Sequence, residues 1–309
     1  MVLNDNRTRA VSSLGWVDRG SLWVYSANEP SPQQITLSDA TYLSVSAGAE
    51  EFFAVVHHWD GKRLEITAHS HLDPRHIISR LALRQALPGS SSRVELSREG
   101  ELSVWDRLPG AFTGYAFGEF QLVLTRYAGE DDVQTFAWFD DRYDKGYQGI
   151  VGANEVPDSS FLIISIQRDS QPVLYDPYTK TAVRKLHLAD RGGNPSFQIR
   201  GSAAEFWATD YDYIVKLDGK TLAVKNAQCV QDAVRGIRQF IGNFCFDSGQ
   251  NICLLARPFS GDAVALDADS MTQVSRIELG RQPLDIGMLA DGTVIARDWK
   301  SGDSLFGKI

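Results

Sequence analysis

The sequence has few cysteines, little basic charge and no long hydrophobic run. Its three cysteines, Cys229, Cys245 and Cys253, lack the spacing of a metal site. An odd number of cysteines in a chain whose first residues lack the apolar segment of a signal peptide predicts reduced thiols and a cytoplasmic location. Cys245 and Cys253 lie in apolar stretches, so we expect them to be buried as small hydrophobic residues.

The charge balance and the lack of long apolar segments exclude two classes of partner. Lys and Arg number 31 against 39 Asp and Glu, giving a net charge of −8, whereas a surface that binds nucleic-acid phosphates needs a basic footprint. No stretch approaches the roughly 20 apolar residues that cross a bilayer as a helix. We therefore expect no nucleic-acid partner and no membrane partner.

Helical periodicity is almost absent, and short β-rich runs take its place. Runs such as Phe52–Val56 and Phe120–Leu124 are bounded by Gly, Asp, Ser or Pro. Many short strands separated by turns indicate a sandwich, a barrel or a propeller. Because 43% of the residues are apolar, the chain can bury a sizeable core in any of these folds.

An internal repeat decides among these folds. Three segments share a strand, an Asp, a short polar turn and a strand that begins with Ala-Val or Gln-Val, the aspartates being Asp176, Asp218 and Asp267. Each Asp can close its turn by accepting backbone N–H groups. A second set of turns, which we place between the first two strands of each unit, recurs every 44 or 45 residues, at Asp158, Ala203, Asp247 and Asp291.

Extrapolating the second set of turns backwards reaches Asp60-Gly61 and Asp18-Arg19-Gly20, which predicts seven units. An irregular unit between Asp60 and Asp158 leaves six as the alternative. Four-stranded units of this length are the blades of a β-propeller. We predict an all-β, single-domain propeller over residues 1–309, whose last blade has three strands of its own. A strand near Thr8 to Leu14 would complete that blade and close the ring.

The C-terminal half resembles a known repeat. In the stretch Asp262–Arg297, a strand and Asp are followed by a turn, a second strand, Gly280-Arg-Gln-Pro283 and a strand ending in Asp291-Gly292. This order is similar to the YVTN-type β-propeller repeat, over residues 146–309. Ile295-Ala-Arg-Asp298 stands where that family has Tyr-Val-Thr-Asn. The resemblance implies a seven-bladed propeller and no particular activity.

The repeat predicts which residues gather at one mouth of the central channel. If the second strand of each blade begins after a turn of the second set, the strand ends at the rim opposite to these turns. This places Asn28, Glu29 and other polar residues together at that rim. Arginine guanidinium groups at this rim could bind an anionic ligand. The alternative is that these charged residues only face water and form Arg–Asp pairs at the ends of strands. The residues predicted to bind a ligand are Arg126, Arg168, Asp212, Arg257, Arg297, Asp298 and Trp299.

Five of the six histidines fall between positions 57 and 76. His69 and His71 are two residues apart on a strand and share a face, and His76 could complete a three-imidazole site for a divalent metal ion. His57 and His58 fall at the other end of the strand, roughly 25 Å away by strand rise. A solvated histidine-rich loop is the alternative to a metal site.

These residues support three functions. The main prediction is a propeller that binds a small molecule or peptide at the channel mouth. An alternative is a propeller enzyme of specialised metabolism, a hydrolase, lyase or cyclase, with His69, His71 and Asp210 as catalytic residues and an optional metal ion. The third is a scaffold for protein partners.

Overall fold

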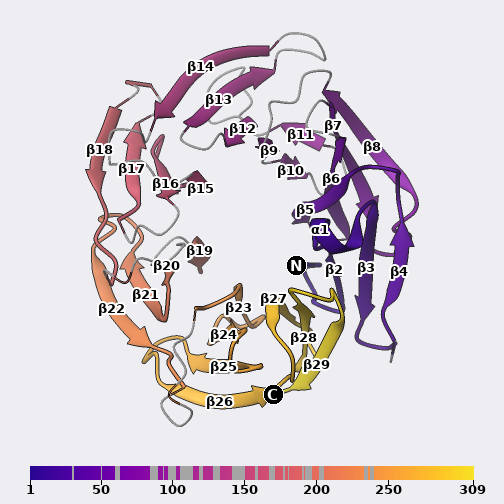
Figure 1. The fold of residues 1–309 in the computed structure, drawn as a ribbon, viewed down its shortest axis with the longest axis vertical. Coiled ribbons are helices and arrows are strands. Elements are labelled where there is room, and N and C mark those ends of the chain that lie inside the picture. Colours follow the sequence, from indigo (N-terminus) through magenta and orange to yellow (C-terminus); the bar gives the residue numbers. More distant parts are fainter. Residues whose placement is uncertain are drawn as a thin grey trace. The chain divides into compact units, whose positions relative to one another are not determined.

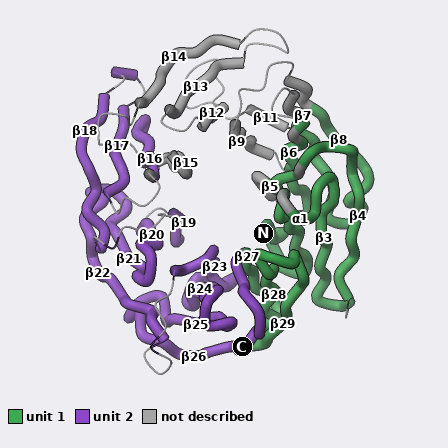
Figure 2. Tube along the Cα trace, in the orientation of Figure 1, with its two compact units in different colours: residues 1–116, 125–136, 285–309 green, residues 117–124, 137–284 purple. Residues whose placement is uncertain are grey.

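The computed structural model describes most of the 309 residues. The positions not described are 30, 50, 60–62, 84–89, 93, 97–101, 105–113, 118–120, 128–132, 141–149, 157–158, 167–170, 177, 180, 190, 192–196, 202–204, 233–235 and 237–239. The chain divides into two compact units: residues 1–116, 125–136 and 285–309 form the first, and residues 117–124 and 137–284 form the second (Figure 2). The single domain over 1–309 stays a prediction.

The first unit contains the sheets at both ends of the chain (Figure 1). The first sheet has the order β1-β2-β3-β4, the second β5-β6-β7-β8, and the last sheet has three strands, β27-β28-β29. The helix α1 (Gly15–Asp18) precedes β3. The strands are β1 (Val2–Leu3), β2 (Arg9–Ser12), β3 (Ser21–Ser26), β4 (Gln33–Thr36), β5 (Tyr42–Ala49), β6 (Phe52–Trp59), β7 (Arg63–Ser70), β8 (Ile77–Leu83), β27 (Pro283–Met288), β28 (Thr293–Asp298) and β29 (Ser304–Lys308).

The second unit contains three further sheets of four antiparallel strands, each ordered along the sequence. They comprise β15 (Ile150–Glu155), β16 (Leu162–Ile166), β17 (Val173–Asp176) and β18 (Thr181–Lys185); β19 (Phe197–Arg200), β20 (Glu205–Asp210), β21 (Tyr213–Asp218) and β22 (Val224–Cys229); and β23 (Phe244–Phe246), β24 (Ile252–Arg257), β25 (Asp262–Asp267) and β26 (Gln273–Glu278).

Six strands, β9 to β14, lie in the sequence between the sheet β5–β8 and the sheet β15–β18. Strands β14-β13-β12-β9 form one sheet and β10-β11 form a pair. Their bounds are β9 (Ser90–Ser92), β10 (Val94–Leu96), β11 (Leu102–Val104), β12 (Gly114–Phe117), β13 (Gln121–Tyr127) and β14 (Val133–Asp140). The prediction of an all-β chain of four-stranded antiparallel units is therefore confirmed.

Burial follows strand position within a sheet. The third strands β21 and β25 are buried along most of their length, whereas the fourth strands β18 and β22 are exposed almost throughout. A third strand has hydrogen-bonded neighbours on both edges, and its apolar side chains pack into cores such as the cluster around Trp207, Phe244 and Leu266. Continuous apolar runs such as residues 263–266 reflect burial on both faces.

The turns predicted from the three aspartates are confirmed. Oδ1 of Asp176 accepts hydrogen bonds from the N–H groups of Tyr178 and Thr179. Asp218 and Asp267 each accept from two backbone N–H groups and one hydroxyl in the same positions of their turns. Each turn joins the third and fourth strands of its sheet, so the repeat marks a real structural unit.

The second set of turns is assigned correctly in the later sheets and wrongly in the first two. Asp247 and Asp291 lie between first and second strands, as predicted. Gly20 instead lies between the second and third strands β2 and β3, and positions 60–61 fall in the sequence between β6 and β7. Asp60, Gly61, Asp158 and Ala203 themselves lie outside the described residues. Backward extrapolation therefore slipped by one strand, because it crossed the six strands β9–β14, which interrupt the sequential four-strand order.

The predicted closing strand is also placed elsewhere. Residues Arg9–Ser12 form β2, which pairs with β1 and β3 in the register Val11↔Val24 and not with the last sheet. Ring closure by this stretch is therefore not confirmed. The first and last sheets instead meet through side chains, as Ala10, Tyr25, Leu289 and Ile295 form one buried cluster.

The expectation for two of the cysteines is confirmed in this fold. Cys245 and Cys253 are buried, as predicted. Within the described part of the chain, no helix is long and apolar enough to cross a membrane.

Candidate functional site

A chain of side-chain hydrogen bonds runs through the sheet that carries the histidines. Ser38 Oγ lies 2.9 Å from His57 Nδ1, and His57 Nε2 lies 2.6 Å from Thr67 Oγ1. Thr67 Oγ1 is in turn 2.7 Å from His69 Nε2, and His69 Nδ1 is 2.8 Å from the carbonyl oxygen of Pro74. His57, Thr67 and His69 are all buried.

The chemistry at the end of this chain sets its direction. A carbonyl oxygen only accepts, so His69 donates from Nδ1 to Pro74 and its Nε2 must accept from the Thr67 hydroxyl. The Thr67 oxygen then accepts from His57 Nε2, and His57 Nδ1 accepts from the Ser38 hydroxyl. Burial lowers the pKa of His69 to about 4, in agreement with this arrangement.

The sequence prediction of a large separation between His57 and His69 is wrong. Their ring centroids are 6.5 Å apart. In the β6–β7 hairpin His57 lies opposite Glu65, and His69 lies opposite Phe53 on the same face. The separation along the strands is thus four residues rather than eight, and the side chains lean toward Thr67 between them.

His71 has a different environment. Its ring is fully buried 4.9 Å from the Phe53 ring, centroid to centroid, and neither ring nitrogen has a hydrogen-bond partner among the described residues. Burial and the nearby Arg9 guanidinium lower its pKa to about 4. The imidazole therefore remains neutral near pH 7 and packs as an aromatic side chain.

The geometry of the described residues does not support metal binding by His69, His71 and His76. Both ring nitrogens of His69 are used within the fold, and His76 is exposed. Among the residues that the structure describes, no group of three His, Cys, Asp or Glu side chains is placed to hold a metal ion. Sharing a strand face brings His69 and His71 against Phe53, which leaves them in an apolar core rather than around an ion.

Asp210 and Asp212 act as acceptors for nearby loops. Oδ2 of Asp210 accepts from the backbone N–H groups of Ala189 and Arg191, at 2.9 and 3.2 Å. Asp212 pairs with the Arg191 guanidinium at 3.1 Å and also accepts from Gln231. Burial alone would raise the pKa of Asp212, but these bonds hold it below its ordinary value. Both carboxylates are fully buried and occupied within unit 2.

The predicted anion-binding arginines are likewise buried. Arg257 makes a bidentate pair with Asp262 at 2.7 and 2.6 Å and donates to the carbonyl oxygen of Val230. Arg297 is fully buried, and it donates to the carbonyl oxygen of Gly302 and to Asp18. The Arg257 guanidinium is thus paired within the protein. Arg297 uses Nε and one Nη in internal hydrogen bonds, and its other Nη is buried without a hydrogen-bond partner among the described residues.

The remaining predicted ligand residues divide in two. Asp298 closes the turn after β28 by accepting from Lys300 N, Ser301 N and the Ser301 hydroxyl, and Trp299 lies in that turn, partly exposed. The side chain of Arg126 and the whole of Arg168 fall outside the described residues.

The slip in strand phase explains why the predicted residues do not occupy equivalent positions. Asp210, Arg257 and Arg297 end second strands, whereas Glu29 and His71 follow third strands. Neighbouring antiparallel strands end at opposite edges of their sheet. Residues chosen as one rim therefore belong to two different ends of the repeating unit.

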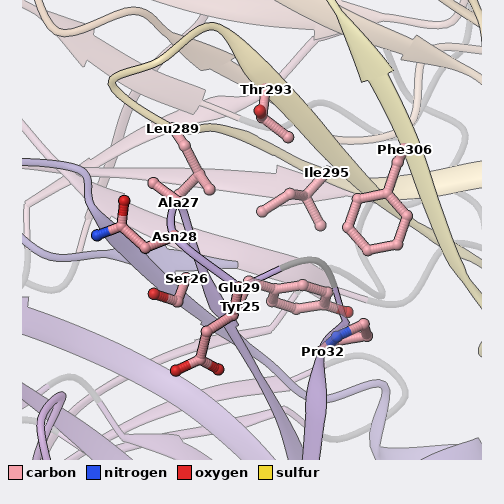
Figure 3. A pocket seen from close by; sticks show the side chains of 10 residues that line it. All are labelled: Tyr25, Ser26, Ala27, Asn28, Glu29, Pro32, Leu289, Thr293, Ile295 and Phe306. Atoms are coloured by element: carbon pink, nitrogen blue, oxygen red, sulfur yellow. The ribbon is translucent and has the colours of Figure 1, made fainter.

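A groove between the first and last sheets is a candidate site formed wholly by described residues. Figure 3 shows the side chains that line it. It has a volume of about 440 Å³, within the range of ligand-binding clefts, and all its lining residues belong to unit 1. Sequence reasoning placed Asn28 and Glu29 at a ligand site but missed the apolar residues from the last sheet. The lining residues are Tyr25, Ser26, Ala27, Asn28, Glu29, Pro32, Leu289, Thr293, Ile295 and Phe306.

The groove has a buried apolar floor and one exposed aromatic side chain. Tyr25, Leu289 and Ile295 are buried, whereas Phe306 is 47% exposed and contacts the Tyr25 ring edge to face at 6.2 Å. Burial raises the pKa of Tyr25 to about 12, so its hydroxyl stays protonated, and it lies 2.9 Å from Ser304 Oγ. Glu29 is the only charged residue in the described lining, and it is exposed.

The sequence search and the structure search give different results. No protein-family model matches the sequence, and no curated protein matches it. The structure is similar to the β-propeller domain of Cps50 (Swd1) from Myceliophteria thermophila, with a TM-score of 0.67 and 11% identity over 100% of this chain and 95% of that one. The fold is a β-propeller.

Two more solved structures agree with this fold. A chain of the mitotic checkpoint complex matches with a TM-score of 0.61 and 11% identity, covering 99% of this chain and 88% of that chain. Sqt1 from Saccharomyces cerevisiae matches with a TM-score of 0.54 and 12% identity, covering 94% and 79%. These neighbours are WD40-type propellers, so the propeller prediction is confirmed, while the YVTN repeat type and the count of seven blades stay predictions.

Proposed function

We propose that this propeller is a protein-interaction module, and that the groove between its first and last sheets binds an apolar segment of a protein partner. The observation that carries the proposal is Phe306, a large aromatic side chain that is 47% exposed at the edge of an apolar groove. Exposed aromatic residues beside pockets are typical anchors of protein interfaces.

The charges of the groove indicate the chemistry of the partner. Glu29 is exposed in the lining, and the whole chain carries a net charge of −8. A basic side chain in the bound segment would face Glu29 and be attracted by the acidic surroundings. Membership of one structural neighbour in the mitotic checkpoint complex supports an interaction role for this fold.

The buried residues of the histidine sheet and of the strand ends are engaged in contacts within the protein. His69, Asp210 and Arg297 each have hydrogen-bond partners within the protein, and they lie at 1% relative exposure or less. The groove, by contrast, is open and has no internal partner for Glu29 among the described hydrogen bonds and ion pairs. The interaction role is therefore assigned to the groove.

Photo-crosslinking from the groove tests the proposal. A photoreactive phenylalanine analogue at position 306 is expected to crosslink one partner in cells, and binding of that purified partner is then measured in solution. We expect Phe306→Ser to weaken its affinity at least tenfold, as for a central aromatic anchor.

Phe259→Ser is the matched control, because Phe259 is 44% exposed and also makes an edge-to-face aromatic contact, with Phe240 at 5.1 Å. Its affinity should equal that of the unmodified protein. Equal weakening by both substitutions, or by neither, would overturn the proposal.

A further inference from the structure

Among the residues that the structure describes, the last sheet has three strands and none in the fourth position. In the four-stranded sheets β1–β4, β15–β18, β19–β22 and β23–β26, strand order follows the sequence, and a fourth strand covers the outer edge of the third. In the last sheet, the third strand is β29, and within the described part of the chain it pairs only with β28.

Burial reflects this difference. In the third strand β25 the first five residues are all buried, and in β21 the central four are buried. In β29 only Leu305 is buried, and Phe306 is 47% exposed. β29 therefore has the position of a covered strand but the exposure of an edge strand.

The hydrogen bonds between β28 and β29 show which backbone groups face the open edge. Ile309 N donates to Gly292 O at 3.1 Å, and Asp298 N donates to Asp303 O at 2.9 Å. Bonded and non-bonded pairs alternate along an antiparallel ladder, so Leu305 and Gly307 also bond to β28. The N–H and C=O groups of Ser304, Phe306 and Lys308 consequently point away from β28.

The open edge and the groove share a residue. Phe306 directs its backbone to the open edge, and its side chain lines the groove together with Ile295, the residue opposite it in the register. A strand added to β29 would place alternate side chains along the groove, in reach of Glu29. The edge thus supplies backbone recognition, and the groove supplies side-chain recognition.

We propose that the partner segment binds as an extended β-strand along β29 and becomes the fourth strand of the last sheet. This inference rests on the proposed function and specifies its mode, which is strand addition. The segment carries an apolar side chain for the groove and a basic side chain on the same face for Glu29. The apolar floor and the single carboxylate of the described lining favour this composition.

One segment of the chain itself provides a probe. A synthetic peptide of residues 272–279, Thr-Gln-Val-Ser-Arg-Ile-Glu-Leu, contains β26, which pairs with the third strand β25 as a fourth strand. Val274 and Arg276 lie two residues apart, so in a regularly paired added strand they would share one face, although β26 itself has a register shift at Val274. Amide hydrogen exchange of the protein, measured with and without this peptide, should show slower exchange at Phe306 and Lys308 and no change at Leu305 and Gly307.

Two substitutions at one position isolate the backbone contribution. Lys308→Pro removes an N–H that points to the open edge and spares the bonds to β28, since proline is tolerated on edge strands. Lys308→Ala removes the same charge and keeps the N–H. We expect Lys308→Pro to bind the peptide at least tenfold more weakly than Lys308→Ala, with circular dichroism confirming that both are folded.

The other outcomes separate the inference from the proposed function. Equal binding by the two Lys308 variants, together with loss in Phe306→Ser, would mean groove docking without strand addition and would overturn the inference alone. Absence of peptide binding up to about 1 mM would also overturn it and leave the crosslinking test to decide the proposed function. A dimer of the free protein that Lys308→Pro abolishes would assign the edge to a second copy and overturn the partner assignment.

Discussion

The Arg297 guanidinium donates to the carboxylate of Asp18 at 2.7 Å, although 279 residues separate them in the sequence. The same oxygen of Asp18 accepts from the indole N–H of Trp23 at 2.9 Å, and Arg297 lies 5.1 Å from the centre of the Trp23 ring. The side chains of Arg297 and Asp18 are both almost completely buried. This contact joins the last sheet to the first within unit 1.

Removal of Arg297 should therefore be costly. In Arg297→Leu the Asp18 carboxylate stays buried without its cation, and we expect the free energy of unfolding to fall by about 3–5 kcal/mol. Urea denaturation measures the change. Lys300→Leu, at an exposed position in the neighbouring turn, is the control and should change stability by less than about 0.5 kcal/mol. Similar losses in both variants would contradict a structural role specific to Arg297.

Thr67 should be essential to the hydrogen-bond chain through its hydroxyl rather than its shape. Thr67→Val keeps the volume but leaves His57 Nε2 and His69 Nε2 without their shared partner. We expect a loss of about 1–3 kcal/mol for each unsatisfied buried group. Thr67→Ser retains the hydroxyl and should recover most of this loss in the same urea experiment. A valine variant as stable as the serine variant would rule out the proposed bond direction.

Stability should decrease in acid because of His69 and His71. Both have a pKa of about 4 in the folded protein against 6.5 in the unfolded chain. The unfolded chain therefore binds more protons between pH 6.5 and 4, and stability is full above pH 6.5 and is lost as the pH falls toward 4. For each histidine, the difference between its folded and unfolded pKa values corresponds to about 3 kcal/mol of the free energy of unfolding. About 2 kcal/mol of this contribution should be lost, for each histidine, by pH 5.

Urea titrations at pH 7.5 and 5.0 measure this loss. His71→Phe should remove about half of the pH dependence, whereas His187→Gln, at an exposed position, should retain all of it. An unchanged pH dependence in His71→Phe would show that this imidazole titrates normally in the folded protein.

Gly20 should not tolerate a side chain. A Cβ at this position would lie 2.1 Å from the carbonyl oxygen of Ser38, which is backbone and cannot rotate away. Gly20→Ala should lower the free energy of unfolding by about 1–3 kcal/mol or more, and the shift of Ser38 should also weaken its bond to His57. Gly280→Ala is the control, because its Cβ would meet nothing within 4 Å and only its positive φ of 69° opposes the change. The thermal midpoint should fall further in Gly20→Ala.

Local sequence patterns predicted the parts of this protein that depend on neighbouring residues. The aspartates at 176, 218 and 267 close the turns that the sequence predicted, because an Asx-turn needs only its own Asp and the next few N–H groups. The four-stranded antiparallel unit could be predicted for the same reason, since strand, turn and strand recur in order along the chain.

The site was less accessible to sequence reasoning. A charged residue at a strand end predicts either a ligand contact or an internal ion pair, and only the packed structure distinguishes them. Arg257 lies beside Asp262, and Arg297 meets Asp18, so both became structural pairs. The one-strand slip at Gly20 also displaced Glu29 and His71 from the rim on which they were predicted to lie.

By itself, the sequence determined the all-β class, the repeating unit and the burial of its apolar strands, because these follow from alternation and turn chemistry within about 45 residues. The tertiary structure alone decided that β2 belongs to the first sheet, that His57 and His69 share a hydroxyl, and that β29 has an open edge beside a groove. These features depend on which distant segments pack together, since the groove is built from residues 25–32 and 289–306.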